Sequence, residues 1–105
     1  MILKPTTFGI DSLLSQPSIY KKNRIALVCN DASVTNKGVA TRVALLEREF
    51  KIVKLFSPEH GLSAAGVDGQ YQTDGIDSHT GLSITSLYGD HFAPQEEDFK
   101  GVDLV

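Results

Sequence analysis

Short, nearly continuous apolar runs recur along this chain in place of strict alternation between apolar and polar residues. RIALVC, from Arg24 to Cys29, and KIVKLF, from Lys51 to Phe56, are two of them. Such runs are typical of strands covered on both faces of a parallel sheet. LSITSLY, from Leu82 to Tyr88, and VDLV, from Val102 to Val105, have the same character. The pattern therefore predicts four strands.

A helical pattern separates the first two predicted strands, between Gly38 and Phe50. Apolar residues recur there at helical spacing while charged residues fall mostly on the other side. The apolar residues are Val39, Val43, Leu46 and Phe50, and the charged residues are Arg42, Glu47, Arg48 and Glu49. A strand, a helix and a strand in this order predict parallel strands joined by a right-handed crossover. The expected fold class is α/β, with a mostly parallel sheet and flanking helices.

Two shorter helices are predicted outside this unit. One holds Ile10, Leu13 and Leu14 and ends before Pro17, because the residue ahead of a proline is pushed out of helical geometry. The other follows Pro94, where acidic residues in a first turn suit the helix dipole. Residues 57–82 lack sustained periodicity and are rich in glycine and aspartate. A loop of that length in a compact domain usually carries a function.

Length and charge limit the possible partners. A chain of 105 residues with 41% apolar residues suits one small domain. The net charge of -3 comes from 13 acidic and 10 basic residues without blocks of like charge, so nucleic acid and anionic membranes are not expected as partners. No run approaches the roughly 20 apolar residues of a membrane span, and none of signal-peptide length opens the chain. Whether the protein is periplasmic, secreted or cytoplasmic stays open at this point.

The chain stops on DLV, without the polar linker that usually marks a domain boundary. We therefore expect residues 1–105 to be a truncated N-terminal domain whose C-terminal domain is absent from this chain. A sheet edge left exposed in this way would favour self-association.

Polar residues follow each of the first three predicted strands. Ligands of open α/β sheets bind outside the carboxyl ends of the strands, so these residues are expected to cluster at a ligand-binding edge. They are Asn30 and Asp31 after the first strand, Ser57, Glu59, His60 and Gly61 after the second, and Tyr88, Gly89, Asp90 and His91 at the end of the third.

Several chemistries lack their motifs. The turn after the first strand has no G-x-G-x-x-G cradle, and GLSAAGVD has valine and aspartate where a phosphate loop needs lysine and Ser or Thr. Ser57 is not in a G-x-S-x-G elbow. The three histidines are too dispersed for a zinc site, so no metal or other cofactor is expected, although a hard cation at Asp68, Asp74 and Asp77 stays open.

Carboxylate chemistry at Glu59 remains. A glutamate beside the apolar Phe56 and Pro58 can have its pKa raised by desolvation, and it can then donate a proton to a leaving group. Glycosidic bond cleavage uses such an acid. The alternative is a glutamate that caps a helix or pairs with an arginine at the surface, and a histidine in such a position is more often a hydrogen-bonded structural residue than a base. The residue types alone do not decide.

LFSPEHGL, DSHTGLSITSLYG and FKGVDLV, preceded by RIALVCN, resemble the N-terminal domain of the NamZ-type exo-β-N-acetylmuramidase family, formerly a domain of unknown function. The resemblance covers nearly the whole chain in the right order. It implies a Rossmann-like domain of a glycoside hydrolase that releases terminal N-acetylmuramic acid from peptidoglycan fragments. A C-terminal domain would close the cleft, so the isolated chain is expected to be inactive. A non-catalytic sugar-binding or interaction module is the alternative.

The resemblance also implies roles for individual residues. Glu59 corresponds to the family's candidate catalytic acid, and His60 is expected beside the substrate. Asp77 ranks first as the second catalytic carboxyl, although aspartates of such loops are often turn residues that bond backbone amides. The substrate-binding residues are expected to be Asn30, Ser57, Gly61, Tyr88 and Gly89.

Overall fold

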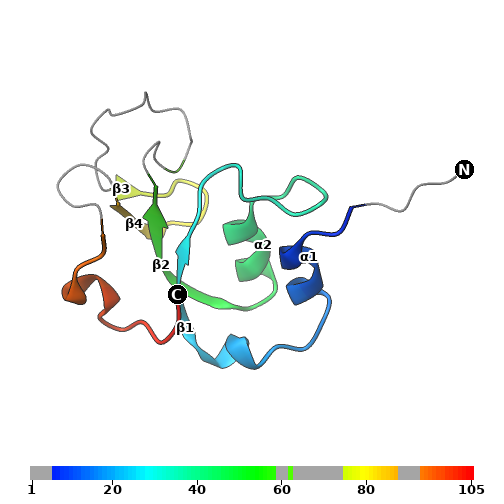
Figure 1. The fold of residues 1–105 in the computed structure, drawn as a ribbon, viewed down its shortest axis with the longest axis horizontal. Helices are drawn as coiled ribbons and strands as arrows, with labels where there is room; N and C mark the ends of the chain where they lie inside the picture. The colour runs from blue at the N-terminus through cyan, green and yellow to red at the C-terminus, as the bar shows by residue number, and fades with distance from the viewer. Residues whose placement is uncertain (1–5, 59–61, 63–74, 88–92) are drawn as a thin grey trace, which may run out of the picture.

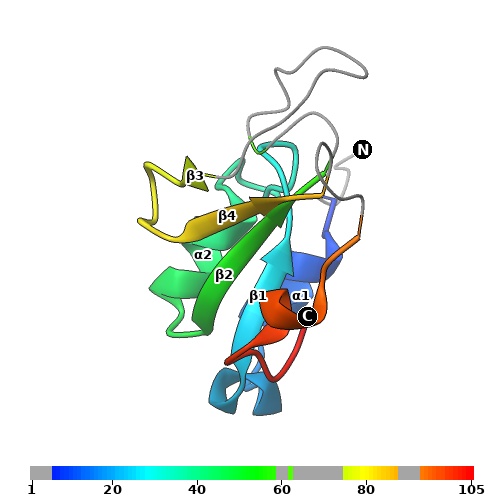
Figure 2. The same cartoon turned by 90° about the vertical axis from the view of Figure 1, so that its left-hand side faces the viewer.

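A four-stranded sheet forms the centre of the chain. The structure, a computed structural model, describes residues 6–58, 62, 75–87 and 93–105. The strands lie in the order β1-β2-β4-β3, and they are β1 (Arg24–Val28), β2 (Lys51–Ser57), β3 (Gly75–Ile76) and β4 (Ser83–Ser86). β1, β2 and β4 are parallel, whereas β3 is antiparallel to β4 (Figure 2). The predicted α/β class with a mostly parallel sheet is confirmed.

Helices cover both faces of this sheet. α1 (Gly9–Leu14) and α2 (Thr41–Glu47) lie on one face, and the 3-10 helix η2 (Glu96–Phe99) lies on the other, as Figures 1 and 2 show from two directions. A further 3-10 helix, η1 (Ile19–Lys22), leads into β1. Within the described ranges, no helix is long and apolar enough to cross a membrane.

β2 is the central strand and supplies the middle of the core. Leu55 and Phe56 are fully buried, and Ile52 is nearly so. On the η2 face, the Phe56 ring lies 6.0 Å from the ring of Phe99. Lys54 also reaches η2, with its Nζ 3.3 Å from Asp98 Oδ1. The near-continuous apolar run in the sequence thus marks a strand that is packed from both sides, as predicted.

α2 is shorter than the predicted helix, and the residues that it buries are not those that the apolar pattern predicted. It begins at Thr41, so Val39 precedes it and is 39% exposed, next to an antiparallel bridge between Val34 and Ala40. Ala44 and Leu45 are buried, and so is Arg42, which is only 2% exposed. The expectation that Arg42 lies away from the packed face is wrong, because its guanidinium pairs with the buried Asp77, in the turn between β3 and β4.

The connection from α2 to β2 explains where the helix stops. Glu49 has a φ of 67°, in the left-handed region that ends helices. Its amide donates to the carbonyl of Leu46, and the amide of Phe50 donates to the carbonyl of Leu45. Phe50 is buried at 3% exposure although it lies beyond the helix. The apolar pattern in the sequence therefore includes Phe50, which is buried but lies outside α2.

The C-terminal residues lie beside the outer edge of β1. Leu104 forms a parallel bridge with Ile25, and the amide of Ala26 donates to the carbonyl of Leu104 over 2.9 Å. Asp103 accepts hydrogen bonds from the backbone and side chain of Arg24. The predicted strand from Val102 to Val105 is thus reduced to one bridge.

Candidate functional site

The loops that follow β1, β2 and β4 leave the sheet on the same side, at the carboxyl ends of these three parallel strands. We call this side the candidate edge. Ser57 ends β2, is 2% exposed and lies opposite Ser86 of β4 in the register. The amide of Leu87 donates to the carbonyl of Ser57 over 2.8 Å. Ser57 therefore belongs to the packed base of the edge and not to its exposed surface.

Asn30 begins the loop after β1 and shapes it. Its side-chain Oδ1 accepts the amide of Ala32 at 2.9 Å, and its carbonyl accepts the amide of Ser33 at 3.0 Å. An asparagine that bonds the backbone two residues later forms a tight local turn. Asn30 lies at the edge, where the sequence predicts it, and is half-buried.

The loops after β1 and β2 contact each other directly. The amide of Asp31 donates to the carbonyl of Leu62 over 2.6 Å. Leu62 is three residues beyond Glu59 in the sequence, and Ser57 is two residues before it. Ser57 and Leu62, on the two sides of Glu59 in the sequence, are therefore held by hydrogen bonds to a neighbouring strand and loop.

Asp77 is buried at 3% exposure, and its carboxylate is already engaged. Arg42 Nε donates to its Oδ2 at 2.8 Å, and Arg42 Nη2 donates to its Oδ1 at 3.4 Å. The hydroxyl of Thr80 donates to Oδ2 at 2.6 Å, and the amide of His79 donates to Oδ1 at 3.3 Å. The contact with the amide of His79 is that of a turn residue, which is the alternative that the sequence left open for Asp77, and the pairing with Arg42 is an addition that the sequence did not predict.

The electrostatics of Asp77 agree with that geometry. Burial by itself would raise the pKa of the Asp77 carboxyl, but the hydrogen bonds from Arg42, Thr80 and His79 outweigh it and lower the pKa below its usual value. The group is therefore ionised at neutral pH and accepts hydrogen bonds only.

Several of the residues predicted for the site lie outside the described residues. They are Glu59, His60, Gly61, Tyr88, Gly89, Asp90 and His91, together with Asp68 and Asp74 of the cation alternative. Among the described residues, no group of three or more His, Cys, Asp or Glu side chains gathers as metal ligands would.

Cys29 follows β1 at the base of the same edge and is 5% exposed. Burial raises the pKa of its thiol to about 11, with smaller opposing effects from neighbouring charges. The thiol is therefore protonated at neutral pH. A buried, protonated thiol of this kind packs as a small apolar residue.

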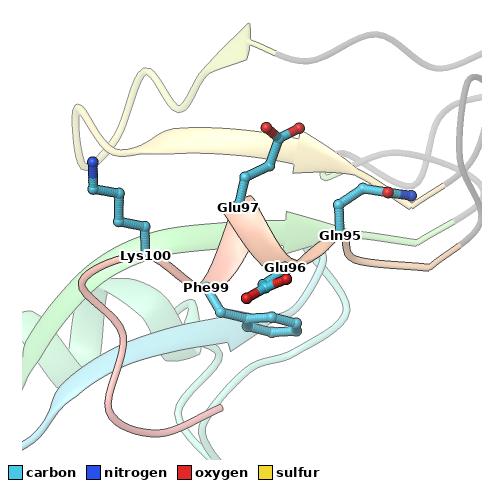
Figure 3. A pocket seen from close by; sticks show the side chains of 5 residues that line it. All are labelled: Gln95, Glu96, Glu97, Phe99 and Lys100. Carbon is cyan, nitrogen blue, oxygen red and sulfur yellow. The ribbon is translucent and has the colours of Figure 1, made fainter.

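A hollow of about 800 Å³ lies beside η2. It is lined by Gln95, Glu96, Glu97, Phe99 and Lys100. Figure 3 shows these side chains pointing in different directions from η2, so they do not converge on one point in the hollow. The described lining does not resemble a site that would orient a ligand.

Comparison with known proteins identifies the family. A family model described as "Exo-beta-N-acetylmuramidase NamZ, N-terminal" matches residues 25–105. The chain belongs to this family. The match covers β2, β3, β4 and all of β1 except Arg24, together with the loops that follow β1, β2 and β4 and the C-terminal bridge to β1. The predicted membership in the NamZ N-terminal family is therefore confirmed.

Relatives of known sequence and structure agree with the family match. The chain is 37% identical over 103 residues to peptidoglycan beta-N-acetylmuramidase NamZ of Bacillus subtilis (strain 168), covering 92% of this chain and 24% of that protein. Two crystal structures of DUF1343 family proteins from Bacteroides fragilis NCTC 9343 are similar, with TM-scores of 0.77 and 0.68 at 33% and 31% identity. Each match covers 93% of this chain and 24% of the other chain. The chain thus spans about a quarter of the length of these relatives.

Arg42 is the residue at this edge that sequence reasoning missed. Its helical position placed it among charged residues that are usually exposed, and its partner Asp77 is 35 residues away in the sequence. The one available signal was Asp77 itself, because a buried carboxylate needs a cationic partner. No spacing rule identifies which of the basic residues provides it.

Proposed function

We propose that this chain is the N-terminal part of a glycoside hydrolase that removes terminal N-acetylmuramic acid from peptidoglycan fragments, with Glu59 as the general acid. The observation that carries the proposal is the family match over residues 25–105. The 37% identical relative is a peptidoglycan beta-N-acetylmuramidase by name, which supports the substrate class.

The described surroundings of the S-P-E-H-G block support an acid at Glu59. Phe56 and Ser57 are buried directly ahead of it, and Pro58 is half-buried. A carboxyl group that is desolvated by such packing favours its neutral form, which is the form that protonates a leaving oxygen. His60 is proposed to contact the sugar, and the further sugar-binding residues are proposed to be Asn30, Gly61, Tyr88 and Gly89. Ser57, expected from sequence to bind the sugar, is proposed instead to support this segment from beneath, because it is only 2% exposed.

The second catalytic group is proposed to come from elsewhere than Asp77. Glycosidases use a second carboxyl group or, in some families, the acetamido group of the substrate itself. Because both oxygens of Asp77 already accept hydrogen bonds, its contacts favour an anchoring role. The remaining three quarters of the relatives' length supports the proposal that the full-length protein, and not the 105-residue chain alone, forms the complete cleft.

Substituting Glu59 tests the proposal. In the full-length protein, Glu59→Gln is expected to lower turnover of a chromogenic N-acetylmuraminide by about 10²- to 10⁴-fold, because an amide cannot donate the proton of a general acid. Glu47→Gln is the matched control, since Glu47 is an exposed glutamate at the end of α2, and its turnover should equal that of the wild type.

Two results would contradict the proposal. Near wild-type turnover by Glu59→Gln would remove this residue from the chemistry. Calorimetric binding of a muropeptide by the intact wild-type protein without release of N-acetylmuramic acid would instead favour a sugar-binding module.

A further inference from the structure

A buried arginine lies beneath the candidate edge, and nothing in the proposed chemistry uses it. Arg42 projects from α2 and is 2% exposed. A guanidinium remains charged under all ordinary conditions, so its burial requires ionic partners. The partners of the Arg42 guanidinium are Asp31 and Asp77, which belong to two different segments of the chain.

One side of the guanidinium binds the turn that leads into β4. Nε and Nη2 form a fork onto the two oxygens of Asp77, and Asp77 in turn holds Thr80 and His79. This pair is buried on both sides, with side-chain exposures of 3% and 2%. If Arg42 contacted only Asp77, a contribution to the stability of the fold would be a sufficient explanation of the pair.

The other side of the guanidinium reaches the loop after β1. Nη1 lies 3.0 Å from Asp31 Oδ1, and since it is not aligned for a directed hydrogen bond, the contact is ionic. The Asp31 side chain is 49% exposed, so this half of the network is accessible to solvent. Asp31 is also the residue whose amide binds the carbonyl of Leu62.

We propose that Arg42 is a positioning residue of the candidate site, which acts through Asp31 to hold the loop after β1 against Leu62, three residues after Glu59 in the sequence. This inference rests on the proposed function, because it takes the loops after β1 and β2 as parts of the sugar site. Arg42 touches three segments of this edge directly or through one residue, and they are the loop after β1, the turn before β4 and the end of the S-P-E-H-G-L segment.

Asp31→Asn in the full-length protein is the decisive variant. Removing Arg42 itself would leave Asp77 buried without a counter-charge and endanger folding. Asp31→Asn removes only the ionic contact with the loop, keeps the Asp31 amide in place and leaves the buried Arg42–Asp77 pair intact. A half-exposed ion pair contributes little to stability, so the melting temperature should change by no more than about 2 °C.

The expected result has two parts. The hydrogen-exchange protection factor of the amide at residue 31 should fall about 5-fold or more, because the loop opens more often. The protection factor is used because it is relative to the intrinsic exchange rate of each residue type, so that aspartate and asparagine can be compared. kcat on an N-acetylmuraminide should fall about 10-fold with KM changed less than about 3-fold, since a small displacement of a loop at a reacting centre costs rate more than affinity.

Asp103→Asn is the matched control. Asp103 also pairs with an arginine, Arg24, and its side chain is 36% exposed, but the pair lies at the outer edge of β1 beside the C-terminal residues. This variant should leave both the protection at residue 31 and kcat as in the wild type. An equal effect of both variants would show a general loss of stability and overturn the positioning role.

The two readouts separate the two proposals. Unchanged protection at residue 31 in Asp31→Asn would overturn the positioning role of Arg42, whatever the activity. A wild-type protein without muramidase activity would overturn the proposed function, while reduced protection in the variant would still support the anchoring of the loop by Arg42.

Discussion

At the scale of single residues, one buried ion pair connects α2 to the turn before β4 beneath the candidate edge. Arg42 and Asp77 are both nearly inaccessible, and the lowered pKa of the Asp77 carboxyl keeps the pair charged at neutral pH. Asp77 was predicted from sequence either as a catalytic carboxyl or as a turn residue, and its contacts favour the second. The arginine could not be predicted, because helical spacing placed it with exposed charges.

Removing the cation of this pair should be costly. Arg42→Met is expected to lower the free energy of unfolding by about 3–5 kcal/mol at pH 7, because Asp77 would remain buried without a counter-charge. Urea denaturation followed by circular dichroism measures this loss.

Arg24→Met provides the matched comparison for that measurement. Arg24 pairs with Asp103 in an exposed contact with side-chain exposures of 56% and 36%, so a much smaller loss is expected. Equal losses in the two variants would contradict the view that burial makes the Arg42–Asp77 pair important.

At the scale of secondary structure elements, the apolar runs identified β1 and β2 almost to the residue. In β2 the near-continuous character reflects packing on both faces, with α2 on one side and Phe99 of η2 on the other. The pattern did not identify β3, because Gly75–Ile76 carries two exposed residues and pairs only through its backbone with β4. Hydrophobic periodicity contains no information on such a strand.

The central position of β2 leads to a prediction for that element. Leu55→Ala should lower the free energy of unfolding by about 2–5 kcal/mol, because it removes a fully buried side chain from a closely packed core. Val53→Ala in the same strand should cost less than about 1 kcal/mol, since Val53 is 39% exposed. Urea unfolding of both variants tests the prediction, and a comparable loss for Val53→Ala would show that burial is not the cause.

At the scale of the whole molecule, the sheet has one edge that the described residues cover only in part. Leu104 pairs with β1 as far as Ala26, and no described residue pairs with the outer edge of β1 beyond it. Val28 at the end of this edge is 49% exposed. The expectation of an exposed edge, made from the sequence, is still a prediction about behaviour in solution.

The 105-residue chain should therefore self-associate as its concentration rises, through edge-to-edge pairing of β1. Size-exclusion chromatography with light scattering would detect this association. Val28→Lys should shift the equilibrium toward the monomer, because a charge at an open edge opposes pairing. Val39→Lys, at an exposed position outside the sheet, should have no such effect. A chain that stays monomeric at every concentration would contradict the prediction.

The bridge between Ile25 and Leu104 also bears on the order in which the molecule is made. Arg24 and Asp103, which flank this bridge, are 79 residues apart in the chain. During synthesis on the ribosome, β1 emerges before β2, its inner neighbour, and both emerge before Leu104, the outer neighbour of β1. Contacts between such distant residues form late, so the nascent protein keeps β1 unpaired on this side until Leu104 has been made.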